Sequence, residues 1–205
     1  MIYYISDTHL GDLRVFDKCS RPFSGLEDLE REIITKWNKK VRKEDVVYVL
    51  GDIAEDNYTK AIEIFKILNG VKHLVVGNHD LKMLPFIEES KIFESINFMK
   101  LINDNGRKVF LCHYPVMDWM EFSRGGYHVY GHIHNKTGKN DPAYVQIKEY
   151  FKDKLAYNAG IDVTHYEPVT LDEMIELKEL NKNEPYINWR HGWSWQIDNM
   201  SKISG

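Results

Sequence analysis

The chain has 205 residues, of which 43% are hydrophobic and 28% charged, and its formal net charge is -4. This length predicts one domain with a substantial core, the composition excludes an intrinsically disordered chain, and the acidic balance argues against a broad electrostatic grip on nucleic acid. The 2 cysteines, Cys19 and Cys112, form no CxxC pair, which argues against a disulfide scaffold or a thiolate zinc site. The sequence contains no signal peptide and no membrane-spanning stretch, so we expect a cytoplasmic protein without a membrane partner.

The first predicted strand, residues 2–6, is followed directly by Asp7 and His9. Residues i and i+2 of an extended chain lie on the same face, so these two side chains can bind one metal ion together. Taken alone, the pair is explained better by an exposed polar loop. A loop at residues 14–23 and a helix with an apolar stripe at Leu29, Ile33 and Trp37 are expected next.

The following segments form a strand–helix–strand unit. A strand at residues 45–50 ends in Gly51-Asp52, a helix spans residues 58–68, and a strand at residues 74–76 ends in Gly77-Asn78-His79-Asp80. The carboxyl ends of parallel strands meet at one edge of a sheet, where ligands bind in α/β proteins, so we expect these polar residues to lie near Asp7. For Gly77-Asn78 alone, ordinary turn chemistry is the alternative.

Two further predicted strands end in histidines. The strand at residues 108–112 ends in His113, and the strand at residues 127–130 leads into Gly131-His132-Ile133-His134. The loop between them contains Trp119 and Arg124, which could meet a substrate ring and phosphate or simply form a surface loop. A strand and turn at residues 155–162 and a helix from residue 170 follow. We expect residues 1–180 to form the domain and residues 181–205 to be an aromatic tail packed on it.

The strand ends together supply seven oxygen and nitrogen donors and no sulfur, namely Asp7, His9, Asp52, Asn78, His113, His132 and His134. One ion does not need seven protein ligands, so we expect two divalent ions that share a carboxylate, Asp52. Imidazole and carboxylate ligands favour Mn, Fe, Zn, Co or Ni over Mg or Ca. Two such ions and two carboxylates leave a net charge of about +2, or about +1 with a bridging hydroxide, which should attract a phosphate ester.

The order D-x-H, G-D, G-N-H-D, strand-end H and G-H-x-H resembles the calcineurin-like metallophosphoesterase superfamily, and Asn158-Ala159-Gly160-Ile161-Asp162 looks like the end of its small single-domain members. The resemblance implies a four-layer α/β/β/α sandwich. It also implies one metal held by Asp7, His9, Asp52 and His134, and another held by Asp52, Asn78, His113 and His132. Asp12 departs from the pattern, because close relatives look more often like His there, and its charge would weaken phosphate attraction or shift substrate choice.

The expected activity is dinuclear metal-dependent hydrolysis of a phosphodiester or phosphomonoester that is small or nucleotide-like. A metal-bridging hydroxide would attack phosphorus, and His79 would protonate the leaving alkoxide. Asp80 is assigned to the catalytic group with His79, where it would orient the region. Asn78 and Arg124 would contact the substrate. A catalytically silent binding module of the same fold is the alternative, although all seven ligand types and His79 are retained. A nuclease would need a basic groove, which this composition does not offer.

Overall fold

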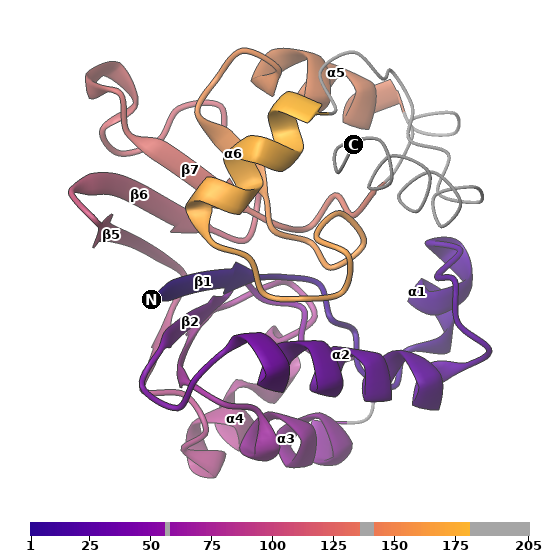
Figure 1. Cartoon of the computed structure of the whole chain (residues 1–205). Coiled ribbons are helices and arrows are strands. Elements are labelled where there is room, and N and C mark those ends of the chain that lie inside the picture. Colours follow the sequence, from indigo (N-terminus) through magenta and orange to yellow (C-terminus); the bar gives the residue numbers. More distant parts are fainter. Residues whose placement is uncertain (56–57, 136–141, 181–205) are drawn as a thin grey trace, which may run out of the picture.

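The computed structural model describes residues 1–55, 58–135 and 142–180, shown in colour in Figure 1. Two sheets of four strands pack face to face, and helices cover the outer side of each sheet. The layers therefore run helix, sheet, sheet, helix, which confirms the α/β/β/α sandwich. The predicted aromatic tail, residues 181–205, lies outside the described residues.

The first sheet is entirely parallel. Its strands run in the order β1 (Ile2–Ile5), β2 (Val46–Val49), β3 (Val71–Val75) and β4 (Ser95–Asn97). Three helices pack on its outer face, namely α2 (Leu26–Lys40), α3 (Tyr58–Ile67) and α4 (Leu84–Ser90). The apolar stripe predicted for α2 is buried in this layer, since Leu29, Ile33 and Trp37 are at most 1% exposed. Parallel sheets covered on both faces require such apolar strands and helix faces.

The second sheet begins with a hairpin and continues in parallel. Its strands are β5 (Met99–Asp104), β6 (Arg107–Cys112), β7 (Tyr127–Tyr130) and β8 (Ala156–Asn158). Asn105 and Gly106 connect β5 to β6 with φ of 51° and 87°, the left-handed pair that a tight hairpin turn needs. α5 (Pro142–Phe151) packs on the outer face, and α6 (Leu171–Leu180) packs beside β1 and β8.

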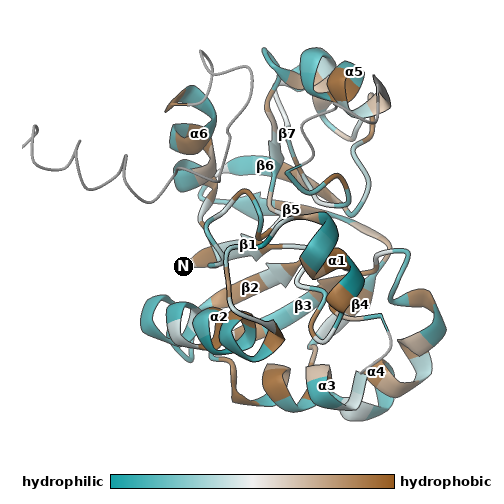
Figure 2. Ribbon diagram, turned by 90° about the vertical axis from the view of Figure 1, so that its right-hand side faces the viewer, coloured by the Kyte–Doolittle hydropathy of each residue, from teal (hydrophilic) through white to brown (hydrophobic). Residues whose placement is uncertain are grey.

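Helices α2 and α3 carry both hydrophobic and hydrophilic residues, coloured brown and teal in Figure 2, and their buried hydrophobic residues belong to the core on the first sheet. This is the pattern of surface helices on a globular core. Within the described ranges, no helix combines the length and the apolar character needed to cross a membrane.

The loop expected at residues 14–23 contains a short helix, α1 (Leu13–Lys18). The carboxylate of Asp12 caps its start by accepting hydrogen bonds from the main-chain N–H groups of Arg14 and Val15, at 2.9 and 3.2 Å. None of the residues of α1 is buried. Phe16 packs against the core of the first sheet, but a helix of six residues is too short to show a repeating apolar pattern, which is why the sequence did not reveal it.

Candidate metal centre

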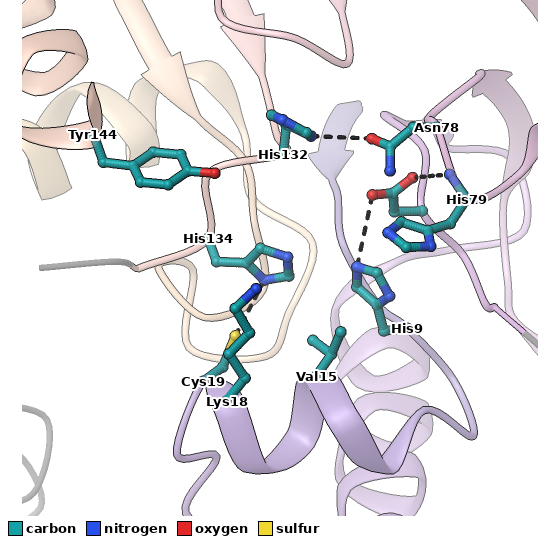
Figure 3. A pocket seen from close by; sticks show the side chains of 10 residues that line it. His9, Val15, Lys18, Cys19, Asn78, His79, His132, His134 and Tyr144 are labelled. Carbon is teal, nitrogen blue, oxygen red and sulfur yellow. Dashed lines mark hydrogen bonds and ion pairs between the residues drawn. The ribbon is translucent and has the colours of Figure 1, made fainter. Parts of the chain in front are cut away.

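The carboxyl ends of five strands meet at one edge of the sandwich. In the first sheet Ile5 pairs with Val49 and Val49 with Leu74, so the polar segments after β1, β2 and β3 start side by side. In the second sheet Leu111 pairs with Val129, so His113 and the histidines after β7 leave from the same edge. The side chains there line a pocket of about 180 Å³, drawn in Figure 3.

Asp7, His9 and His134, which we call the first cluster, offer ligand atoms that lie within 4.8 Å of one another. Nε2 of His134 lies 3.9 Å from Oδ1 of Asp7. Nε2 of His9 points toward Asp52 and lies 3.7 Å from its Oδ2. The first cluster therefore opens onto the Asp52 carboxylate.

Asn78, His113 and His132 form the second cluster on the other side of Asp52. Nε2 of His113 lies 3.2 Å from Oδ2 of Asp52 and 3.2 Å from Oδ1 of Asn78. The same Asn78 oxygen lies 3.0 Å from Nδ1 of His132. Nδ1 of His113 lies 2.6 Å from the main-chain oxygen of Leu50, and a hydrogen bond there directs the Nε2 lone pair into the cluster. All seven predicted donors are thus gathered around one carboxylate.

Five of the seven donors have left-handed backbone conformations. The φ angles are 58° for Asp7, 44° for His9, 54° for Asp52, 71° for His132 and 50° for His134. Residues other than glycine rarely adopt these angles, at a cost of about 1 kcal/mol or more each, and such residues gather at functional sites. These strained backbone conformations direct the donor side chains toward one another.

Glycines precede the ligand residues because a side chain would occupy the space that the carboxylates need. A Cβ atom on Gly77 would lie 2.2 Å from Oδ1 of Asp52. On Gly131 it would lie 1.9 Å from Oγ of Ser6 and 2.5 Å from Oδ2 of Asp7. In the G-N-H-D and G-H-x-H motifs, any residue larger than glycine at the first position would therefore clash with these side chains.

The chemistry of these residues fits divalent metal ions. His9 is 1% exposed, and neither of its ring nitrogens has a hydrogen-bond partner among the described residues. A buried polar atom left unsatisfied costs about 1–3 kcal/mol, and an ion held between Nε2 of His9 and Asp52 would remove that cost. Nitrogen and oxygen donors, with His113 fixed by a second hydrogen bond, are typical of transition-metal sites.

Three of the donors, Asp52, His113 and His134, have shifted pKa values. Burial favours a higher pKa for Asp52, but the hydrogen bond with His113 and the charge of that ring outweigh it and lower the pKa to about 2. Burial favours a lower pKa for His113, but Asp52 raises it to about 9. Burial also favours a lower pKa for His134, but the hydrogen bond to Asp162 outweighs it and raises the pKa to about 10. Metal binding must therefore displace protons from these rings.

Asp80 has a structural position within the site. Its carboxylate is fully buried and accepts main-chain hydrogen bonds from Asp52, Ile53 and Gly77 at 2.9, 3.0 and 2.8 Å. Burial raises the pKa of this carboxyl group. Asp80 ties the loop after β2 to the loop after β3, which fits the predicted orienting role and not direct contact with a reacting group.

His79 lies on the pocket wall beside the first cluster, with its ring 5.1 Å from the ring of His9. Its Nδ1 lies 3.5 Å from Oε1 of Glu55, and its main-chain oxygen accepts a hydrogen bond of 3.0 Å from the hydroxyl of Tyr58. Glu55 also pairs with Arg14. Sequence reasoning missed Glu55, although its place three residues after Asp52 is a signal that could have been tested.

Arg124 is not brought to the pocket. It belongs to the 3-10 helix η2 (Phe122–Arg124), its side chain is exposed, and Nη1 pairs with Oε1 of Glu121 at 3.2 Å. The predicted substrate contact therefore has no geometric support. Trp119 is a core residue instead, because it is buried and its Nε1 donates to the main-chain oxygen of Gly126 at 2.9 Å.

Asp12 is turned toward a candidate ligand. Its Oδ2 lies 3.5 Å from Nδ1 of His9, and the interaction with that ring is the main cause that lowers the pKa of this carboxyl group. Asp12 is buried, with 6% of its surface exposed. The extra negative charge therefore acts on His9 rather than on the open part of the pocket.

Comparison with known proteins supports the geometry. Residues 1–182 match the family described as calcineurin-like phosphoesterase. The MJ1445 protein of Methanocaldococcus jannaschii is 32% identical over 189 residues, which are 91% of this chain and 96% of that protein. The gene 66 protein of Mycobacterium phage D29 is 24% identical over 201 residues, 86% of this chain and 94% of that protein.

Among solved structures, AQ665 from Aquifex aeolicus, a protein of unknown function, superposes with a TM-score of 0.67 at 28% identity. The match covers 86% of this chain and 98% of AQ665. The family match extends from before the first candidate ligand to beyond the last, so the edge that gathers the seven donors lies within it. On these grounds the chain belongs to the calcineurin-like phosphoesterase family.

Proposed function

We propose that the protein is a dinuclear metal-dependent hydrolase of small or nucleotide-like phosphate esters. The observation that carries this proposal is the position of Asp52, whose Oδ2 faces His9 at 3.7 Å and His113 at 3.2 Å, so that one carboxylate can serve two ions. Membership of the family supports a phosphate ester as the substrate. When bound, two divalent ions would neutralise the phosphoryl oxygens and lower the pKa of a coordinated water toward about 7.

The protein groups around the ions have separate tasks. His79 can hold a proton for the leaving alkoxide, because Glu55 lies on its Nδ1 side and leaves Nε2 for the substrate. Asn78, which lies at the second cluster and lines the pocket, is placed to contact both an ion and a phosphoryl oxygen. Asp80 keeps the two loops that carry these residues in register.

The pocket wall supports a small anionic substrate. Of the described residues that line it, Lys18 is the one that carries an ammonium or guanidinium group. Lys18 and Val15 come from α1, whereas Tyr144 comes from α5 on the facing side (Figure 3). A pocket of about 180 Å³ accepts the phosphate and the first atoms of its ester group. We propose neither a membrane nor a nucleic acid as a partner.

The test is an assay of protein that has been stripped with a chelator and reloaded with Mn²⁺, Co²⁺ or Ni²⁺. p-Nitrophenyl phosphate, bis-p-nitrophenyl phosphate and cyclic nucleotides distinguish monoester from diester hydrolysis. We expect turnover with at least one metal and none after stripping. The Asp104→Asn variant, altered far from the pocket, serves as a positive control. Absence of turnover with every metal and substrate would favour the silent binding module.

A further inference from the structure

Arg21 links the two parts of the first cluster, although it is not one of the predicted ligands. Its side chain is buried, with the residue 4% exposed. Nη1 donates to the main-chain oxygen of Thr8 and Nη2 to that of Asp7, both at 2.9 Å. These carbonyl groups belong to the turn between Asp7 and His9, which have φ of 58° and 44°. Arg21 therefore stabilises a strained turn that carries two candidate ligands.

The same guanidinium group holds a carboxylate behind the third ligand. Nε of Arg21 donates to Oδ1 of Asp162 at 2.9 Å, and Nη2 donates to Oδ2 at 3.3 Å, which fixes the plane of the carboxylate. Oδ2 of Asp162 lies 2.8 Å from Nδ1 of His134. The Nδ1–H group of His134 donates there, so that Nε2 is left to face Asp7.

Charge balance explains why an arginine is needed behind Asp162. Nε2 of His134 binds a metal ion only when the ring is neutral. Asp162 is 3% exposed, and beside a neutral ring it would be a buried carboxylate without a counter-ion if Arg21 were absent. An unpaired buried charge is strongly unfavourable, so loss of the guanidinium group would displace the Asp162 carboxylate from its position behind His134.

The second cluster has a different support. His113 is fixed by the main-chain oxygen of Leu50, which no side-chain substitution removes. Within the described ranges the side-chain hydrogen bonds of Arg21 go to Asp7, Thr8 and Asp162, and none goes to a member of the second cluster. The two clusters meet at Asp7, whose carboxylate accepts the main-chain N–H of His132 at 3.0 Å. A change at Arg21 should therefore be felt much more strongly in the first cluster than in the second.

We propose that Arg21 is a positioning residue that sets the metal affinity of the first cluster much more than that of the second, through Asp162 and the carbonyl groups of Asp7 and Thr8. The inference rests on the proposed function, because it requires one ion in each cluster. Loss of a carboxylate–histidine support weakens metal binding by about 10–100-fold.

The experiment is calorimetric titration of the chelator-stripped full chain with Mn²⁺, together with elemental analysis of the bound metal. In the unchanged protein we expect two ions per chain. In Arg21→Gln and Asp162→Asn we expect one site to weaken by about 10–100-fold while the affinity of the other changes much less. Arg21→Lys keeps the charge but not the planar fork, so it should give an intermediate loss at the same site.

Asp104→Asn is the matched control. Asp104 is also a buried carboxylate, 3% exposed, and accepts a hydrogen bond of 2.9 Å from the hydroxyl of Tyr4. It pairs with Arg107 at the far end of the β5–β6 hairpin, whereas Met99 pairs with Cys112 at the end next to His113. We expect both metal sites of this variant to match those of the unchanged protein.

The outcomes separate the two proposals. Two ions bound with unaltered affinity in Arg21→Gln and Asp162→Asn would overturn the role of Arg21 and leave the proposed function standing. Equal weakening of both sites would also overturn it. Absence of metal binding by the unchanged protein would overturn the proposed function itself. If Arg21→Gln does not fold, as judged by thermal unfolding, Asp162→Asn decides, because it replaces a single atom in the same support.

Discussion

The two clusters of candidate ligands are held in place by different parts of the chain. In the second cluster, His113 is fixed by the main-chain oxygen of Leu50, directly after β2. In the first cluster, Nδ1 of His134 bonds Asp162, and Nδ1 of His9 lies 3.5 Å from Asp12. The His113 ring is therefore held by the main chain, whereas the His9 and His134 rings face side chains from other segments.

This difference teaches that two halves of one metal centre can be adjusted separately. A main-chain support is present as long as β2 and β6 remain packed together, whatever side chains surround it. A support made of side chains can be strengthened, weakened or lost by a single substitution. Variation in metal preference should therefore arise at the first cluster.

The largest effect should come from removing the carboxylate that the two clusters share. We expect Asp52→Asn to weaken both metal sites and to lower kcat/KM by at least about 1,000-fold, since two adjacent metal ions supply several kcal/mol of transition-state stabilisation. Metal content and hydrolysis of p-nitrophenyl esters measure the two effects. A variant that lost only one ion would show that Asp52 is not shared.

A change at His79, which lies beside the first cluster, tests whether this residue protonates the leaving alkoxide. We expect His79→Gln to lower kcat by about 100-fold on an alkyl ester, and far less on a p-nitrophenyl ester, because nitrophenolate leaves without a proton. Glu55→Gln should give a smaller loss with the same pattern. Metal content is the control and should not change. Equal slowing with both esters would contradict the assignment of His79 as general acid.

His128 sharpens the comparison because it is a buried histidine that belongs to neither cluster. It lies 3.2 Å through Nδ1 from the main-chain oxygen of Phe110, and Nε2 accepts the N–H of Val116 at 3.2 Å. A neutral ring satisfies both contacts. Burial lowers the pKa of His128 to about 4, despite the opposing hydrogen bond to Phe110.

An unfolded histidine titrates near about 6.5, so between that pH and about 4 the unfolded chain binds more protons than the folded one. The contribution of His128 to the free energy of unfolding is full above pH 6.5 and falls by about 3 kcal/mol as the pH drops to about 4. Urea unfolding across this range should show a shallower pH dependence for His128→Gln. An unchanged slope would show that other groups cause the acid sensitivity.

The smallest effect should come from Lys18, which lines the pocket beyond both clusters. We expect Lys18→Ala to raise KM by about 3–10-fold with kcat nearly unchanged, because an exposed ammonium group contributes modest binding energy to ground state and transition state alike. Lys39→Ala, on the exposed side of α2, is the matched control. A fall in kcat would place Lys18 closer to the reacting phosphate.

The candidate ligands could be predicted because each follows an apolar strand within a motif of fixed order. Asp7, Asp52, Asn78 and His113 are examples, and the parallel arrangement of the strands brings them to one edge. The division into four layers depended on the resemblance to a family, since periodicity alone does not separate one sheet from two. β4 was missed because it has three half-buried residues and no alternation.

The supporting residues could not be predicted because their contacts exist only in the folded chain. Arg21 and Asp162 are 141 residues apart, and although Asp162 ends a motif noted in the sequence, nothing there indicates that it contacts Arg21. Arg124 shows the opposite error. It lies between two strands that end in candidate ligands, but its side chain points to solvent and pairs with Glu121. Proximity along the chain does not reveal the direction of a side chain.

Helix α1 has no fully buried residue, but the residues on either side of it contact the candidate ligands. Its six residues bury no side chain, yet Asp12 before it faces His9, and Arg21 beyond it holds Asp7. Val15 and Lys18 on this helix face the pocket. Apart from Phe16, which packs against the core of the first sheet, side chains on α1 can consequently be exchanged without disturbing the interior or the ligands. This makes the helix a suitable place for library selection of variants that direct the proposed catalytic centre to new esters.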